Sequence, residues 1–194
     1  GSNAPGYPLR PSSTSTTEVA TTTSPYGCRT GDAFVKGEFN GASTIAAENS
    51  IFIVGDLTYV DQNDDILGLV GNNAVWVYNP VNSSNTFLLS KNRTIHAAIL
   101  SVAHTFQVQN YAVSGSGARG TLTVLGAIAQ KYRGPVATAT SGGSIVSGYA
   151  KNYIYDNRFK FKAPPKFLNP VTTTYGVTSW VETSAVFAAD GSAR

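Results

Sequence analysis

Apolar and polar residues alternate in short runs along most of the chain from about residue 32 onward. A period of two is typical of β-strands whose two faces meet different surroundings. Turn signals such as Asn40-Gly41 separate the runs 44–47, 50–54, 66–70, 74–78 and 121–129, which we interpret as strands. The Ala-rich run 95–102 fits a helix or a buried strand by its periodicity, and its short length and β neighbours favour a strand. The pattern predicts an all-β protein.

One segment of this pattern recurs along the chain. Residues 47–53 return as residues 71–77, which aligns Ile51 with Val75 and Asn49 with Asn73. A weaker copy at 103–108 puts His104 in the Asn column, and a fourth at 120–124 keeps only the alternation. Recurrence of this kind predicts stacked structural units, although the copies are unequally spaced. We therefore expect a right-handed parallel β-helix (solenoid) with irregular coils, supported internally by the Asn column.

Composition divides the chain into two parts. Residues 1–27 are rich in Pro, Ser and Thr, and they open with Gly-Ser-Asn-Ala, which resembles a scar from tag removal. Such a segment buries too little apolar surface to offset the entropy of ordering, so 1–27 is predicted to be a flexible linker and 28–194 the β-solenoid domain. The tail after Pro170 is expected to form a short cap. Cys28, the single cysteine, is either a buried small residue or a partner for a cysteine upstream or in another chain.

Charge and hydropathy bear on whether the protein binds nucleic acid or a membrane. Charged residues make up only 13% of the chain and the formal net charge is +3, which is too small to imply nucleic-acid binding without a local patch. No apolar run is long enough to span a bilayer. Membrane contact is therefore expected only through an N-terminal segment missing from this sequence.

An acidic loop at 61–65 is the first candidate for chemistry. Asp61, Asn63 and Asp65 place oxygen atoms at positions one, three and five, as at the start of a calcium loop. The pattern then fails, because position six lacks the Gly and position twelve lacks the Glu. A solvated acidic turn is favoured over a weak metal site. The same loop is the only acidic cluster that could serve a polysaccharide-cleaving β-helix enzyme, and no catalytic residue or cofactor is assigned.

A basic and aromatic stretch between residues 151 and 166 is the second candidate. Such residues on a sheet can neutralise and stack on an anionic glycan or a single-stranded nucleic acid. The alternative, which the pattern favours, is an edge strand with its aromatics packed inward and its lysines blocking edge-to-edge association. The candidate binding residues are Lys151, Tyr153, Tyr155, Arg158, Lys160 and Lys162.

A series of segments between residues 28 and 170 resembles a known group of bacterial surface proteins. The segments are 34–37, 44–49, 51–59, 67–70, 126–136 and 148–159, followed by Pro164-Pro165. In this order they look like the PilX-type pilus-assembly or minor-pilin-like family. The resemblance implies a β-rich exposed C-terminal domain, an upstream export signal or hydrophobic helix that this chain lacks, and no enzymatic activity.

We therefore expect a non-enzymatic, secreted protein of the bacterial cell surface or pilus, active in adhesion or pilus assembly. Its expected partners are other pilus or surface proteins, or further copies of itself. Two alternatives remain open: a polysaccharide-active β-helix enzyme that uses the acidic loop, and a binding module for an anionic polymer, either glycan or nucleic acid, at the basic stretch.

Overall fold

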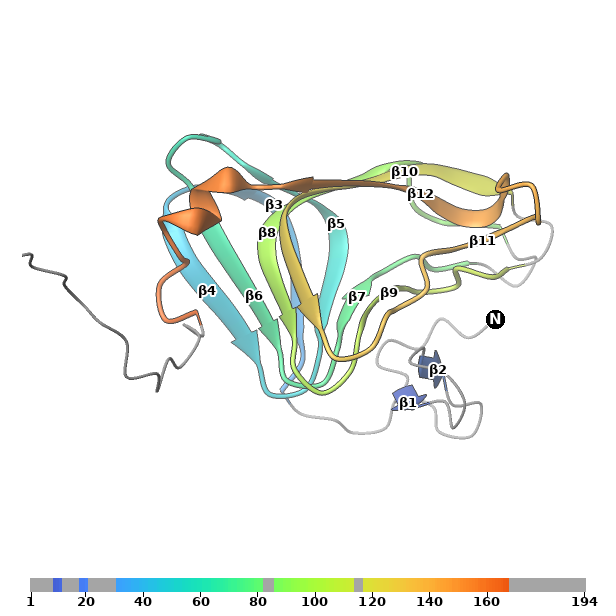
Figure 1. The fold of residues 1–194 in the computed structure, drawn as a ribbon, viewed down its shortest axis with the longest axis horizontal. Helices are drawn as coiled ribbons and strands as arrows, with labels where there is room; N and C mark the ends of the chain where they lie inside the picture. Colours follow the sequence, from blue (N-terminus) through green and yellow to red (C-terminus); the bar gives the residue numbers. More distant parts are fainter. Residues whose placement is uncertain (1–8, 12–17, 21–30, 82–85, 114–116, 168–194) are drawn as a thin grey trace, which may run out of the picture.

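The computed structural model describes residues 9–11, 18–20, 31–81, 86–113 and 117–167. The protein is all-β, as the alternation predicts. Two short strands, β1 (Leu9–Pro11) and β2 (Glu18–Ala20), pair with each other in antiparallel fashion and stay apart from the main sheet. The other ten strands form one sheet (Figure 1). Across these described ranges, the structure contains no helix with the length and apolar character needed to cross a membrane.

The strands of the main sheet follow one another between residues 33 and 155, and a single turn of 3-10 helix follows them. The run 95–102, which fitted two kinds of element, is a strand as favoured. The elements are β3 (Ala33–Phe39), β4 (Ala42–Ala47), β5 (Ile51–Tyr59), β6 (Ile66–Gly71), β7 (Val75–Val77), β8 (Arg93–Ser101), β9 (Phe106–Val108), β10 (Ala118–Gln130), β11 (Ala137–Ala139), β12 (Ile145–Tyr155) and η1 (Asn157–Lys160).

Most neighbouring strands run parallel. One row of pairs joins β3, β5, β7 and β9, and another joins β4, β6, β8, β10 and β12. The long strands change partner along their length, since β5 pairs with β7 at its start and with β8 near its end. The short strand β11 then turns back and pairs with β12 in antiparallel fashion.

The predicted right-handed parallel β-helix is wrong. The strands make a single mixed sheet that curls into a nearly closed, barrel-like form (Figure 1). The physical reason is the unequal length of the strands, which range from 3 residues in β7 to 13 in β10. A long strand bends and pairs with different neighbours at its two ends, so the sheet continues around the curl. The predicted cap after Pro170 and Cys28 lie outside the described residues.

The residues aligned by the recurrence in the sequence are paired in the register of neighbouring strands. Ile51 pairs with Val75, and Val75 pairs with Phe106. Beside them the Asn73 side-chain amide donates to the side-chain oxygen of Asn49 over 3.0 Å. His104 precedes Phe106 by two residues, as Asn73 precedes Val75. The fourth copy, 120–124, does not join this row, since its strand pairs with β8 and β12.

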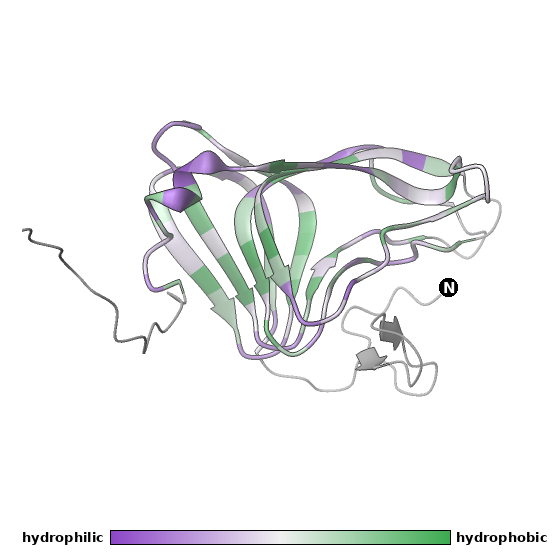
Figure 2. Ribbon diagram, in the orientation of Figure 1, coloured by the Kyte–Doolittle hydropathy of each residue, from purple (hydrophilic) through white to green (hydrophobic). Residues whose placement is uncertain are grey.

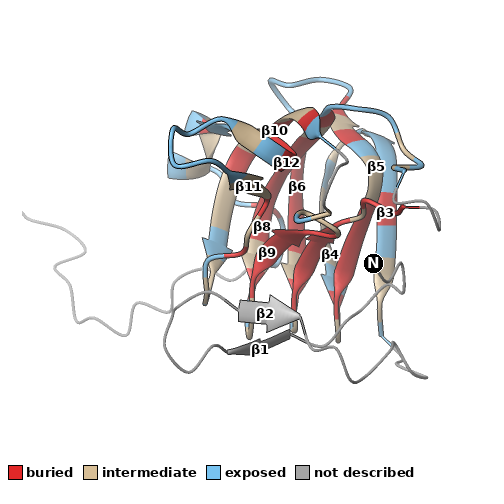
Figure 3. Cartoon of the chain, turned by 90° about the vertical axis from the view of Figure 1, so that its right-hand side faces the viewer, coloured by how far each residue is buried: buried red, intermediate tan, exposed pale blue. Residues whose placement is uncertain are grey.

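The core fills the inside of the curl. Aliphatic side chains from β5, β6, β8 and β10 are completely or almost completely buried there, including those of Ile53, Leu69, Ile95 and Leu122. The apolar residues gather on these strands, and the loops are mostly hydrophilic (Figure 2). The buried residues likewise lie mainly on the strands, and the exposed ones mainly in the loops (Figure 3). Each such side chain contributes roughly 1.5–3 kcal/mol through burial, so the core holds the strand ends, and the loops attached to them, in fixed positions.

Candidate functional site

The acidic loop between β5 and β6 is organised by Asp65, which is only 2% exposed. Its two carboxylate oxygens accept hydrogen bonds from the backbone N–H groups of Gly41, over 2.6 Å, and Asp61, over 2.7 Å. These two bonds hold the pKa of Asp65 below its usual value. The carboxylate therefore ties the β5–β6 loop to the turn between β3 and β4.

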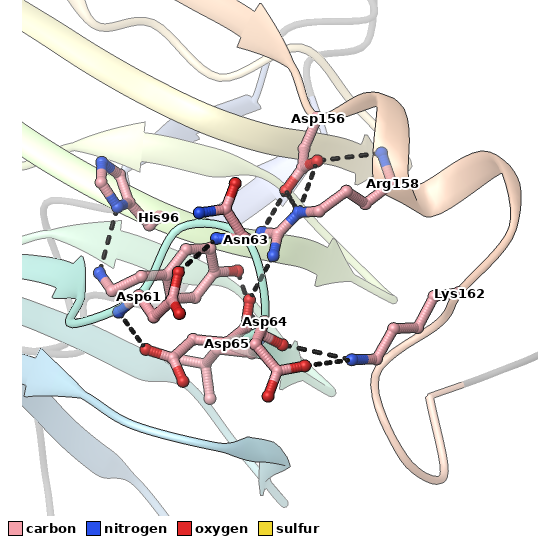
Figure 4. A network of polar contacts seen from close by, with 10 residues as sticks. Asp61, Asn63, Asp64, Asp65, His96, Asp156, Arg158 and Lys162 are labelled. Atoms are coloured by element: carbon pink, nitrogen blue, oxygen red, sulfur yellow. Dashed lines mark hydrogen bonds and ion pairs between the residues drawn. The ribbon is translucent and has the colours of Figure 1, made fainter.

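Two of the three residues that resemble the start of a calcium loop, Asp61 and Asp65, accept hydrogen bonds from backbone amides. The Asp61 carboxylate accepts from the N–H of Asn63 over 2.8 Å, while Asp65 is occupied as above (Figure 4). Within the described ranges, no three His, Cys, Asp or Glu residues come close enough together to hold a metal ion. What the loop shows is a hydrogen-bonded turn.

A second set of contacts joins this loop to the end of β12. Arg158 Nη2 lies 2.6 Å from Asp156 Oδ2, and its Nε also bonds to this carboxylate. Arg158 Nη1 donates to the Asp65 carbonyl oxygen over 2.8 Å, and the guanidinium lies 5.2 Å from the centre of the Tyr59 ring. Tyr59 N donates to Nδ1 of His96 over 3.1 Å. We call these five residues, Tyr59, Asp65, His96, Asp156 and Arg158, the polar network (Figure 4).

Burial and charge set the protonation states in the polar network. Burial lowers the pKa of His96, and the charge of Arg158 lowers it further. Burial raises the pKa of Asp156, but the hydrogen bonds and charge of Arg158 outweigh it and leave the pKa below its usual value. Burial also raises the pKa of Tyr59. At neutral pH these shifts favour a neutral His96 beside the ion pair of Asp156 with Arg158. Such protonation states suit a structural role.

The six candidate residues of the basic stretch separate into two groups. Arg158 belongs to the polar network, and Lys162 contacts the side chain and carbonyl oxygen of Asp64 over 3.3 and 3.2 Å. Lys160 lies exposed in η1. The remaining three, Lys151, Tyr153 and Tyr155, alternate along one face of β12, because its register with β10 is regular from Ala150 onward.

This face of β12 looks into the curl. Lys151 and Tyr153 pair with Leu122 and Val124 of β10, both of which belong to the core. The Tyr153 ring packs edge-on against Phe106 at 6.5 Å, and burial raises its pKa to about 12. Even so, Tyr153 remains 43% exposed and Tyr155 50%. Because the curl is incomplete here, these inward side chains still reach solvent.

A hollow of about 450 Å³ opens beside the first half of this face, between β12 and the turn that leads into β11. Arg133 and Lys151 are its charged lining residues, and burial together with the Arg133 charge lowers the pKa of Lys151. The rest of the lining is mainly apolar and includes Tyr149, which is completely buried. In the part of the chain that the structure describes, neither cation has a carboxylate partner.

Arg133 was missed by reasoning from sequence. It belongs to the short basic run 131–133 after β10, which is far from residue 151 along the chain. Only the pairing of β11 with the start of β12 brings this run to the hollow. A basic turn next to a predicted edge strand was the one available signal.

The edge of β12 is also open. Its partner on one side is β10, from Gly148 to Tyr155, whereas on the other side β11 pairs only with the residues up to Gly148. From Ala150 to Tyr155 the other edge has no strand partner among the described residues. In Figure 1 this stretch runs along the top of the molecule, with β11 below it on the right.

No family model, curated protein or solved structure matches this chain. The geometry of β12 and the polar network is therefore the basis for the functional argument.

Proposed function

We propose that this chain is a non-enzymatic adhesion domain of a cell-surface or pilus-associated protein, and that it binds an anionic polymer along β12. One observation carries the proposal. Lys151 and two half-exposed tyrosines lie on one face of a strand whose edge is open, and Arg133 lines the hollow beside them from the turn before β11. Among the described residues neither cation has a carboxylate partner. Uncompensated positive charge beside exposed aromatic rings attracts an anionic chain and offers it surfaces to contact.

Protection of the edge is the competing explanation for this strand. A lysine that points inward on an edge strand discourages pairing with another chain, and Lys151 fits that role. Edge protection does not require Arg133 across the hollow, nor two tyrosines left half exposed. Binding accounts for all four side chains.

The enzymatic alternative is less well supported by the contacts. The carboxylates of Asp65 and Asp156 accept hydrogen bonds from backbone amides or from Arg158, and neither lines the hollow. A glycosidase needs two carboxyl groups that face a bound sugar from opposite sides. The carboxylates of the polar network act instead as supports for the loop and the strand end.

Retention on immobilised anionic polymers tests this proposal. The whole chain is passed at low ionic strength over polygalacturonate, dextran sulfate and single-stranded DNA, and the eluate is examined for released polymer fragments. We expect retention on at least one polymer, without cleavage, and release as salt screens the charges. Lys151→Gln should weaken retention, and Lys36→Gln on β3, at the far edge of the sheet, should not. Failure of all three columns to retain the chain would refute the proposal.

A further inference from the structure

We propose that the hollow beside β12 holds the carboxylate of a uronate sugar, so that the polymer bound by this domain is a carboxylated polysaccharide. This inference rests on the proposed polymer-binding function and identifies its ligand class.

The charges of the hollow favour one compact anion. Arg133, in the turn before β11, and Lys151, on strand β12, both line the hollow, and their charges repel each other. An anion between them would relieve this repulsion and regain Coulomb energy in a partly desolvated place. The planar guanidinium fork of arginine matches the two oxygens of a carboxylate, and the lysine adds a point charge.

The walls between the two cations favour a ring over a freely hydrated ion. Pro135, Val136 and Ile145 line the hollow, together with the buried ring of Tyr149. A uronate sugar carries its carboxylate directly on a ring whose C–H faces are apolar, so one unit satisfies the cations and the walls together. Tyr153 and Tyr155 follow on the same face of β12 at steps of roughly 7 Å, and they provide half-exposed rings for the next sugars of the chain.

A nucleic acid fits the same surface less well. Its phosphates are evenly spaced and each gains from a nearby cation, so a binding groove needs a row of basic residues along the backbone. On β12 the row is interrupted. Lys151 is followed by two tyrosines, and Arg158 and Lys162 are engaged by Asp156 and Asp64. Lys151 is the one charged residue of β12 itself, and the exposed Lys160 lies beyond the strand, in η1.

Titration calorimetry of the whole chain can test this ligand class with one polymer in two forms, with and without free carboxylates. The probes are polygalacturonate and the same polymer with its carboxylates methyl-esterified, at pH 7 and low salt. Because a hydrogen bond to a charged group contributes strongly, esterification should weaken binding by about tenfold or more. The double variant Arg133→Gln/Lys151→Gln should weaken binding to polygalacturonate by a similar factor, and Lys151→Arg should retain most of it. Lys36→Gln is the matched control, expected to bind as the unmodified chain does.

The possible failures are distinguishable. If the ester binds as well as the acid, or if single-stranded DNA or dextran sulfate binds more tightly than polygalacturonate, the uronate assignment is overturned while polymer binding stands. If none of these polymers binds, both proposals fall. Thermal unfolding of the variants shows whether a loss of binding reflects loss of the fold, and the comparison of acid with ester tests the assignment on the unmodified protein.

Discussion

Asp65 holds the acidic loop through both of its carboxylate oxygens, which accept from Gly41 N and Asp61 N. Asp65→Asn leaves one oxygen and turns an amide NH₂ group toward a backbone N–H, so one donor loses its partner. We expect the variant to unfold at a lower temperature at pH 7. Its unfolding should also depend less on pH below about 4, because the lowered pKa of Asp65 is one source of that dependence.

Asp64→Asn is the matched control, since it makes the same chemical change one residue away. The Asp64 side chain is 84% exposed and its partner Lys162 is 48% exposed. Exposed pairs of this kind contribute about 0–1 kcal/mol, so the unfolding temperature should change little. Equal effects of the two substitutions in a thermal melt would show that Asp65 does not organise the loop.

The role of Asp65 shows which contacts of a single residue cannot be predicted from the sequence. Its spacing from Asp61 and Asn63 suggested a metal ligand as the alternative to a plain turn. The partner that decides its role is a backbone N–H at residue 41, at the turn between two other strands. Backbone amides carry no sequence signal, so such a contact cannot be read from side-chain types.

The strand β10 depends on close approach at Gly126, which pairs with Ala97 of β8 and Tyr155 of β12. A Cβ atom at this glycine would collide with the carbonyl oxygen of Ala97, which is backbone and cannot move aside. We expect Gly126→Ala to lower the free energy of unfolding by about 3 kcal/mol, as in other overpacked sites. Chemical denaturation measures the loss.

Gly142→Ala serves as the control for this substitution. Its added Cβ would meet only the Thr140 hydroxyl at 3.8 Å, an ordinary contact in an exposed turn. The free energy of unfolding should stay within about 0.5 kcal/mol of the unmodified chain. A Gly126→Ala protein as stable as Gly142→Ala would mean that β8 and β10 do not approach as closely as described.

At the scale of elements, alternation located most of the strands but not their assembly. The alignment of Ile51 with Val75 matches the register of β5 and β7. What it could not show is that β5 leaves β7 after three residues and pairs with β8 near its end, because a bend in a strand does not interrupt the period of two. For this reason the prediction of stacked coils was wrong, and the strands form one curled sheet instead.

The same limitation affects the candidate binding site. Lys151, Tyr153 and Tyr155 could be placed on one strand face from their spacing alone. Their separation from Arg158 and Lys162 could not, since it depends on contacts across the fold with the Asp65 carbonyl oxygen and with Asp64. The charge pattern of the sequence thus overstated the length of the basic surface.

At the scale of the whole molecule, the polar network joins β5, the loop before β6, strand β8 and the segment that follows β12. Tyr59, Asp65, His96 and Arg158 come from these four places, and the acidic loop is held from both sides. Protonation of one member should therefore change the free energy of unfolding of the entire sheet.

His96 provides the test. Its Nδ1 accepts from Tyr59 N, so the folded protein requires the neutral ring, and burial together with the Arg158 charge keeps its pKa below the unfolded value of about 6.5. As pH falls through that value, the unfolded chain takes up a proton that the folded chain does not. The free energy of unfolding should decrease from pH 7 toward pH 5 and then level off below the folded pKa. A second decrease should follow below about pH 4. The folded state lowers the pKa values of Asp65 and Asp156, so the unfolded chain takes up protons on these carboxylates before the folded chain does.

Urea denaturation of His96→Gln across this pH range isolates the histidine contribution. Glutamine keeps an acceptor for Tyr59 N but does not titrate, so the decrease between pH 7 and 5 should disappear while the one below pH 4 remains. His104→Gln, which changes the other histidine, should keep both decreases because His96 is retained. If the His96→Gln protein loses stability between pH 7 and 5 as the unmodified chain does, the buried neutral histidine is not what couples the sheet to pH.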